Sequence, residues 1–283
     1  MIGPLGICPI CFETHVREPR VDDLCALFVW AALKTWRDLE DSNRLGASIS
    51  EDSITDMLLL EMARRTQYLA YKRYTRHEES KTSGADWLWW FVSGNRGFPL
   101  LVQAKRLFGG KTPAYSSLKH AGRRSDQTNV LLRHAKQQGW LPIFCFYNFW
   151  DCAQPWAGAP PVHQRELWGC AVAPAGAVKR KLVKTDNSLA SMGPVSKPWL
   201  HLVCPGSERS TVVGVNELPD TVRNELQRAF RLRSVPEVSE KLPDEVRRLL
   251  SGRVGDEASV APEELGFLRG IVAVSDRPIV REG

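Results

Sequence analysis

Three polar side chains stand at positions where they could support phosphodiester hydrolysis. Asp86 opens one apolar stretch, and Gln103 and Lys105 lie two residues apart in the next one, Leu100 to Leu107. Because side chains alternate between the faces of a strand, Gln103 and Lys105 are expected to point the same way. An amide and an ammonium on a core strand are costly unless both find polar partners. A site with a carboxylate, a hard cation and a water would provide them.

Each residue type has a role in such chemistry. Mg²⁺ prefers oxygen ligands and retains several waters, so Asp86 would supply a charged ligand and Gln103 an amide oxygen. The backbone carbonyl of Ala104 is a third candidate ligand, and Mn²⁺ accepts the same donors. Lys105 would orient or deprotonate the attacking water and balance the charge of the transition state.

The neighbouring segments predict the elements that position these residues. Ser93 to Pro99 is rich in turn formers, which indicates an antiparallel hairpin. We expect helices at Asp22–Leu39, from Ser48 onward and at Ser125–Gln138, and strands at Gln67–Thr75, Asp86–Val92, Leu100–Leu107 and Leu141–Phe149. The last strand is apolar on both faces, which is typical of a central position. This order predicts an α/β fold with a mixed central sheet flanked by helices.

The remainder of the chain divides into shorter segments. We expect strands at Glu166–Val172, Trp199–Cys204 and Gly270–Ser275, and helices at Asp220–Leu232 and Pro243–Leu250. Beyond Pro205 the sequence becomes polar, which favours a boundary there. We therefore predict an N-terminal extension at 1–21, a core domain at 22–206 and a partly helical C-terminal appendage at 207–283.

An Asp followed by an x-Gln-x-Lys strand after a hairpin resembles the PD-(D/E)xK nuclease superfamily, in the variant with Gln at the middle position, as in Mrr-like restriction endonucleases. Gly-Ala-Asp-Trp at 84–87 and Gln-Ala-Lys-Arg-Leu at 103–107 also resemble an uncharacterised bacterial family. The likeness covers roughly 22–150, about half of the chain. It implies a restriction-endonuclease-like fold, a Mg²⁺- or Mn²⁺-dependent nuclease acting on DNA, and bacterial restriction or anti-phage defence. A homodimer or a defence-complex partner would fit that setting.

The resemblance also implies a further carboxylate, because Gln103 removes a negative charge from the commoner pattern. In the superfamily a Glu on the first core helix often fills this place, and Glu51 fits by position. Glu79 competes, since it precedes the Asp86 strand closely. Both have simpler interpretations: Glu51 could form a capping box with Ser48, and Glu79 could be a solvated loop residue.

A rival function of a different class remains open from the sequence. Asp86 could cap a turn and Lys105 could extend from a sheet edge, which would leave a catalytically inactive nucleic-acid-binding or scaffold protein. Gln127 could reach the site, although a surface position is the simpler interpretation. Trp87 and its aromatic neighbours up to Phe91 could stack on bases, but core packing is favoured.

Basic residues concentrate in one window. Between Gln103 and Lys136 there are eight Lys and Arg residues against the single acid Asp126, in a chain of net charge +6. This pattern indicates a face for a polyanion, or a solvated basic surface. The candidate DNA-binding residues are Lys119, Arg123, Arg124, Arg133 and Lys136.

The seven cysteines predict no disulfide framework. We find no secretory signal and no apolar run of the roughly 20 residues that cross a bilayer, so the expectation is a cytoplasmic protein with reduced thiols and no membrane partner. Cys8 and Cys11 form one CxxC pair, which His15 and Cys25 could complete as a structural Zn²⁺ site. A single pair is a weak signal, so zinc is not favoured, and a zinc-dependent interaction module is the third alternative.

Overall fold

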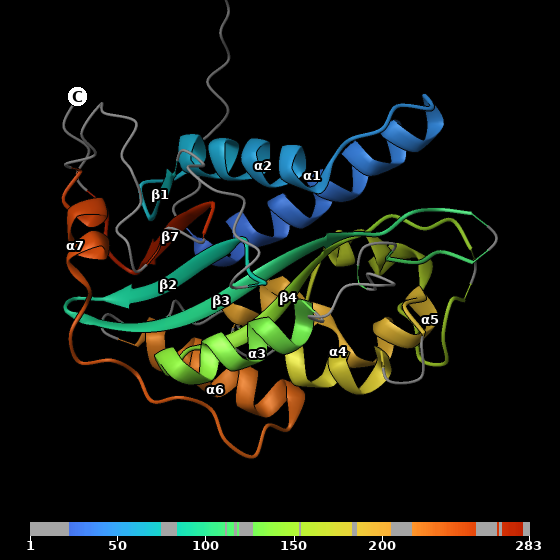
Figure 1. Ribbon diagram of the computed structural model, residues 1–283. Coiled ribbons are helices and arrows are strands. Elements are labelled where there is room, and N and C mark those ends of the chain that lie inside the picture. Colours follow the sequence, from blue (N-terminus) through green and yellow to red (C-terminus); the bar gives the residue numbers. More distant parts are fainter. Residues whose placement is uncertain are drawn as a thin grey trace, which may run out of the picture.

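A mixed seven-stranded sheet lies at the centre of the molecule (Figure 1). The computed structural model describes residues 23–74, 84–110, 112–115, 118, 127–152, 154–182, 186–204, 217–252, 265 and 268–279. The strands are β1 Leu69–Arg73, β2 Trp87–Ser93, β3 Arg96–Arg106, β4 Leu141–Tyr147, β5 Cys170–Pro174, β6 Lys197–Pro198 and β7 Gly270–Ser275. Their order across the sheet is β1-β7-β2-β3-β4-β5-β6, with parallel pairs at β7–β2 and β3–β4. The predicted α/β class is confirmed.

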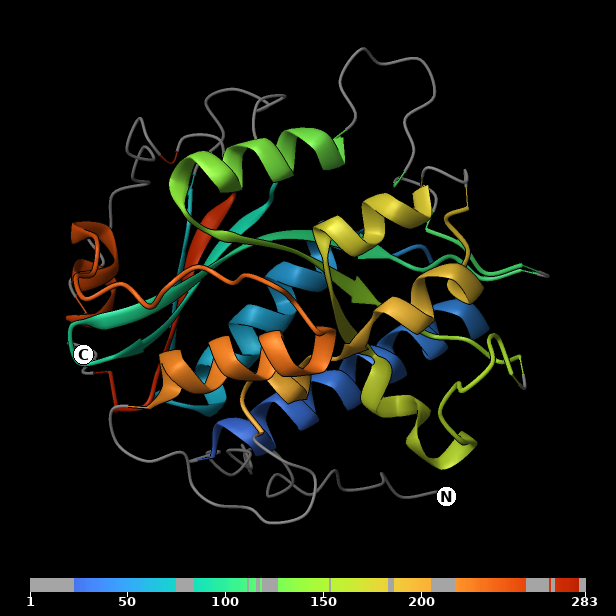
Figure 2. The same ribbon diagram turned by 90° about the horizontal axis from the view of Figure 1, so that it is seen from below.

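Helices cover both faces of this sheet. The α-helices are α1 Leu24–Arg44, α2 Glu51–Arg65, α3 Gln127–Gln138, α4 Ala175–Leu182, α5 Leu189–Met192, α6 Leu218–Phe230 and α7 Asp244–Leu250, and the 3₁₀ turns are η2 Val162–Trp168, η3 Gly193–Val195 and η4 Trp199–Leu202. Figure 2 separates the layers, with α3 and α4 on one side of the sheet and α1, α2 and α6 on the other. A separate apolar cluster fills each interface between helices and sheet. None of the helices in the described residues is long and apolar enough to span a membrane.

The predicted hairpin forms, and it fixes the register of the polar residues. Every residue of β2 is buried, because both faces of the strand lie in a core. The odd-numbered residues pack in the core beneath α1 and α6, and the even-numbered apolar residues pack in the core on the other face of the sheet. The aromatic residues from Trp87 to Phe91 are therefore core residues, as favoured from the sequence, and none is exposed for base stacking. Trp87 pairs with Val102 across the hairpin, so Asp86 lies opposite Gln103.

Some local predictions were wrong. Helix α2 begins after Ser50, whose Oγ accepts the Ser53 N–H at 3.0 Å, so Ser48 forms no capping box with Glu51. The segment predicted as a strand at Glu166–Val172 is a 3₁₀ turn followed by β5. The segment Trp199–Cys204 forms η4 instead of a strand. Short apolar runs are compatible with either structure, and burial of Trp199 against α1 selects the turn here.

The C-terminal segment is not an appendage. Strand β7 inserts between β1 and β2, antiparallel to the first and parallel to the second, and all six of its residues are buried. Helix α6 packs on β2 and β3 over the same core as α1. The boundary predicted at 206/207 is therefore wrong for these elements. A polar stretch along the chain does not reveal that a later strand returns to the middle of the sheet.

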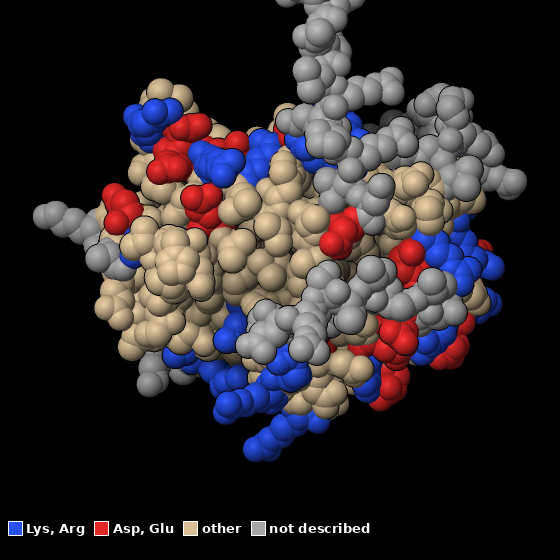
Figure 3. Space-filling model, turned by 180° about the vertical axis from the view of Figure 1, so that it is seen from behind, with Lys and Arg blue, Asp and Glu red and all other residues tan. Residues whose placement is uncertain are grey.

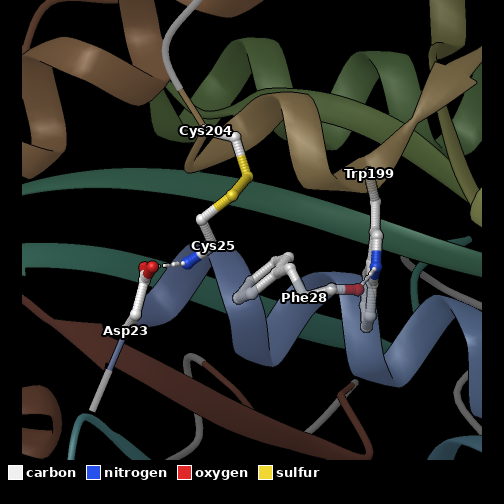
Figure 4. The surroundings of a disulfide bond; sticks show 5 residues. All are labelled: Asp23, Cys25, Phe28, Trp199 and Cys204. Carbon is white, nitrogen blue, oxygen red and sulfur yellow. Dashed lines mark hydrogen bonds between the residues drawn. A yellow bond between two sulfur atoms is a disulfide. The ribbon is translucent and has the colours of Figure 1, made fainter. Parts of the chain in front are cut away.

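A disulfide joins Cys25, in the first turn of α1, to Cys204, which follows η4 (Figure 4). The prediction that all cysteines are reduced was wrong for this pair, because nothing in a separation of 179 residues signals the contact. Cys25 is therefore not available to a zinc site, and Cys8, Cys11 and His15 lie outside the described residues. Beside the bond, Trp199 Nε1 donates to the Phe28 carbonyl at 2.8 Å. The two contacts thus attach the start of η4 and the residue beyond its end to α1.

The remaining thiols among the described residues are Cys145, Cys152 and Cys170. Burial raises the pKa of the Cys145 thiol to about 12 and holds the pKa of Cys170 well above its ordinary value. Thiolates are the reactive form of cysteine, so these two thiols are inert core groups at neutral pH.

Reducing the disulfide should lower the free energy of unfolding by about 2–5 kcal/mol, because the bond closes a long loop in the unfolded chain. Urea unfolding with and without dithiothreitol measures this difference. A Cys25→Ser, Cys204→Ser double variant should be equally stable in both conditions, and Cys152→Ser should keep the full response. Equal stability of the wild-type chain with and without reductant would contradict the expectation.

Candidate functional site

Gly84 determines the path of the backbone just before Asp86. Its φ is +68°, a conformation that favours glycine. A Cβ atom there would meet the Gln127 carbonyl oxygen at 2.4 Å, so the chain passes directly against the first turn of α3. The Asp86 N–H then donates to the Val102 carbonyl at 2.9 Å and starts the ladder with β3. The Gly-Ala-Asp-Trp sequence thus positions Asp86 between α3 and β3.

The Asp86 carboxylate is buried, with 9% of the residue exposed. Its Oδ2 atom accepts hydrogen bonds from Gln103 Nε2 at 2.5 Å and from the Ala104 N–H at 2.9 Å. The hairpin therefore brings together three of the predicted metal-ligand positions, Asp86, Gln103 and Ala104.

Gln103 is almost completely buried, with 1% of the residue exposed, and its amide is held from several directions. Besides the bond to Asp86, Nε2 donates to the Ala104 carbonyl at 3.1 Å, and Oε1 accepts from Gln127 Nε2 at 2.9 Å. The surface interpretation of Gln127 was therefore wrong. A half-turn of the Gln103 amide would exchange its oxygen and nitrogen and direct the oxygen toward Asp86.

Lys105 and Glu51 form a second part of the site. Lys105 Nζ lies 3.0 Å from Glu51 Oε1, and the Lys105 side chain is 4% exposed. Glu51 Oε2 accepts the Arg106 N–H at 3.2 Å. Since Ser50 caps α2, the Glu51 carboxylate is directed to β3. Of the two candidate carboxylates, the structure brings Glu51 to Lys105, while Glu79 lies outside the described residues.

Arg269 and Asp52 are site residues that the sequence reasoning missed. Arg269 Nε lies 3.2 Å from Asp86 Oδ1, and its Nη1 forms an ion pair with Asp52 Oδ1. Burial lowers the pKa of the Arg269 guanidinium, while the nearby Glu51 charge acts to raise it. An arginine stays charged under such conditions. The sequence signal that could have indicated Arg269 is its position directly before the apolar run Gly270–Ser275.

The oxygen donors at the site suit a hard divalent cation. Gln103 Nε2 lies within hydrogen-bonding distance of both Asp86 Oδ2 and the Ala104 carbonyl, so a polar hydrogen sits where two cation-binding oxygens converge. With Glu51 nearby, the set comprises carboxylate, amide and carbonyl oxygens, the ligands of Mg²⁺ and Mn²⁺. Within the described ranges there is no cluster of three His, Cys, Asp or Glu residues of the kind that binds a metal through side chains alone. The residues fit Mg²⁺ if Gln103 and Ala104 contribute.

Arg106, the next residue of β3, is not presented to a ligand. Its Nη1 donates to the Ile49 carbonyl, and its guanidinium lies 5.0 Å from the centre of the Phe108 ring. Burial lowers the pKa of the Arg106 side chain. Its side chain therefore braces the segment before α2, which carries Glu51.

The predicted basic window is described only in part. Lys119, Arg123 and Arg124 lie outside the described residues, whereas Arg133 and Lys136 are exposed on α3. Helix α3 runs from Gln127 at the site, so the two residues lie about 9 Å and about 14 Å along its axis. Helix α4 lies beside α3 (Figure 2) and adds basic residues to this face, namely Lys179, Arg180 and Lys181.

The rear face of the molecule mixes both signs of charge. In Figure 3, Lys and Arg gather along the lower edge, while Asp and Glu are interspersed with them elsewhere. Among the described residues several charges neutralise each other in ion pairs, such as Arg96 with Asp220 at 2.8 Å and Arg223 with Glu237 at 2.7 Å. Away from its lower edge, this face shows no uniform positive charge of the kind that attracts a polyanion.

The model of a family described as "Family of unknown function (DUF6615)" matches residues 24–278. The matched range begins in α1 and includes β7, so it covers both Asp86 and Arg269. No curated protein matches the chain.

Proposed function

The chain belongs to the family of unknown function DUF6615, and we propose that it is a metal-dependent nuclease that hydrolyses phosphodiester bonds in DNA. One observation carries the proposal. A carboxylate, an amide and a lysine ammonium, from Asp86, Gln103 and Lys105, are buried together at one end of a hairpin. A core built only for stability would favour apolar residues at these positions, because burying polar groups gives little net gain.

The residues present match the needs of phosphodiester hydrolysis. A Mg²⁺ or Mn²⁺ ion held by Asp86, Gln103 and the Ala104 carbonyl would polarise the phosphate and lower the pKa of an attacking water. Lys105 carries donors for a water or for a phosphate oxygen, and Glu51 holds its ammonium in place. This division gives Asp86 a ligand's role and Lys105 an acid–base or charge-balancing role.

The order of elements around the site supports a PD-(D/E)xK-like core. The chain passes from helix α2 to the β2–β3 hairpin, then to helix α3 and strand β4. This is the order that we expected from the sequence on the basis of the resemblance to that superfamily. Restriction or anti-phage defence is the setting that this likeness favours, by analogy of fold and not by chemistry.

Incubation with plasmid, linear and single-stranded DNA tests the activity. We expect cleavage with Mg²⁺ or Mn²⁺ and none with EDTA. The inactive alternative, in which the polar cluster only stabilises the fold, predicts intact DNA under all conditions together with measurable DNA binding. Cleavage in EDTA would contradict the proposed metal dependence.

The exposed basic residues of α3 should form part of the DNA path. Replacing Arg133 and Lys136 with Gln should weaken DNA binding and flatten the plot of log affinity against log salt by about 0.9 for each lost phosphate contact. Binding is measured across a salt series in an Asp86→Asn background, which prevents cleavage.

A matched control neutralises two exposed arginines beyond α6, on the opposite side of the sheet, as Arg231→Gln with Arg233→Gln. This variant should keep the wild-type salt slope. If both double variants change the slope equally, the effect reflects net charge and the DNA path is not along α3.

A further inference from the structure

The strand at the C-terminal end of the described chain delivers an arginine to the site. Gly270 pairs with Trp87 in the parallel register of β7 and β2, which brings Arg269 beside Asp86. The Arg269 N–H donates to the Asp86 carbonyl at 2.7 Å, and its own carbonyl accepts the Tyr74 N–H at 2.8 Å. A Cβ on Gly270 would meet the Lys72 carbonyl oxygen at 2.2 Å. The backbone is thus fixed whichever side chain stands at position 269.

The two oxygens of Asp86 receive different partners. Oδ2 is directed to Gln103 and the Ala104 N–H, and Oδ1 to Arg269 Nε at 3.2 Å. The same guanidinium reaches Asp52 in the first turn of α2, next to Glu51. Arg269 therefore connects β2 with the helix that carries the second carboxylate, and its side chain remains 25% exposed.

We infer that Arg269 is a positioning residue, which orients the Asp86 carboxylate so that its Oδ2 atom is available to the divalent cation. Through Asp52, Arg269 also ties this carboxylate to the first turn of α2. The inference rests on the proposed function, because it concerns the affinity of that metal site. Groups that orient metal ligands change affinity by about 10- to 100-fold when they are removed. The planar guanidinium suits this task, since it bonds two carboxylates at once, whereas a lysine ammonium is a single point charge.

A purely electrostatic role makes the opposite forecast. The positive charge of Arg269 repels a divalent cation, so its removal would tighten binding if charge alone mattered. A lysine at 269 would then behave like the arginine. Orientation and charge can therefore be separated by one conservative and one neutral substitution.

The test is a titration of the full chain with Mn²⁺, in which electron paramagnetic resonance measures the concentration of the free ion. We expect Arg269→Lys and Arg269→Gln each to weaken Mn²⁺ binding about tenfold or more. The matched control is Arg223→Lys on α6. Arg223 has a similar exposure and pairs with Glu237, and its replacement should keep the wild-type affinity. Asp86→Asn should lose binding, and thermal unfolding in EDTA should verify that each variant is folded.

The outcomes distinguish this inference from the proposed function. Wild-type affinity in Arg269→Lys, or tighter binding in Arg269→Gln, overturns the inference while the Asp86-dependent metal site stands. Absence of Mn²⁺ binding in the wild-type chain overturns both. If the Arg269 variants do not fold, Asp52→Asn removes the same tether from the helix side. It should weaken Mn²⁺ binding several-fold, and unchanged affinity in that variant overturns the inference.

Discussion

Replacing Asp86 with Asn should reduce DNA cleavage on the order of 10³-fold or more, with the fold and DNA binding retained. Asn keeps the volume and an oxygen that can accept the Ala104 N–H, but it loses the charge that a cation requires. Ala is a less suitable choice, because it would remove the acceptor of the buried Ala104 N–H, which costs about 1–3 kcal/mol, and would leave Gln103 Nε2 with only the Ala104 carbonyl. Rates with saturating DNA and Mg²⁺ measure the effect.

The matched control is Asp220→Asn, which removes an α6 carboxylate that pairs with Arg96 at the start of β3, far along the hairpin from Asp86. That variant should cleave at the wild-type rate. Full activity of Asp86→Asn would exclude the proposed site, whatever the behaviour of the control.

The parts of the site that follow from local chemistry could be predicted from the sequence. A turn of Gly and Asn residues between two apolar runs specifies the hairpin, and strand periodicity places Gln103 and Lys105 on one side of β3. The hairpin register then brings Asp86 opposite Gln103. These contacts depend on fewer than about twenty residues of intervening chain, so the sequence pattern was sufficient.

The rest depends on contacts between distant segments. Nothing near Arg269 signals that β7 inserts beside β2, because strand insertion is decided by packing over the whole sheet. The disulfide between Cys25 and Cys204 was missed for the same reason. The cap of α2 shows a subtler failure. Ser48 stands three residues before Glu51, as a capping box requires, but the helix is capped by Ser50, which directly precedes Glu51. This shift of two positions releases the Glu51 carboxylate from capping, and it pairs with Lys105 instead.

The capping error bears directly on what Glu51 does. Its carboxylate now has two partners, Lys105 Nζ at 3.0 Å and the Arg106 N–H at 3.2 Å. It also lies at the first residue of α2, where a negative charge is favourable. Glu51 is therefore either a cation ligand as well or only the group that holds Lys105.

Replacing Lys105 with Met should reduce the cleavage rate by about 10²- to 10⁴-fold, because an acid–base group acts on the transition state. The affinity for Mn²⁺ should stay within a few-fold of wild type, because Lys105 is not a ligand of the metal. The substitution also leaves Glu51 without its buried cation, which should cost up to about 3–5 kcal/mol of stability. Single-turnover cleavage rates, Mn²⁺ titration and urea unfolding measure the three effects separately.

Strand β1 and helix α7 offer a matched control for this variant. Lys72 Nζ lies 3.0 Å from Glu245 Oε1, the same separation as in the Lys105–Glu51 pair, and both partners are mostly buried. Lys72→Met should lose less stability than Lys105→Met, because Arg248 remains paired with Glu245 Oε2 at 2.6 Å, and it should keep the wild-type cleavage rate. If Lys105→Met behaves like this control, Lys105 serves only the fold.

Glu51→Gln then resolves the role of the carboxylate. Gln keeps an acceptor for the Arg106 N–H and nearly the same volume, but it removes the charge. If Glu51 only holds Lys105, the double variant Glu51→Gln, Lys105→Met should be no less active than Lys105→Met alone, and both should bind Mn²⁺ equally. If Glu51 is a ligand, Mn²⁺ binding should weaken about tenfold whether or not Lys105 is present. We expect the second result, because Gln103 supplies no charge and Asp86 alone gives a divalent cation only one negative ligand.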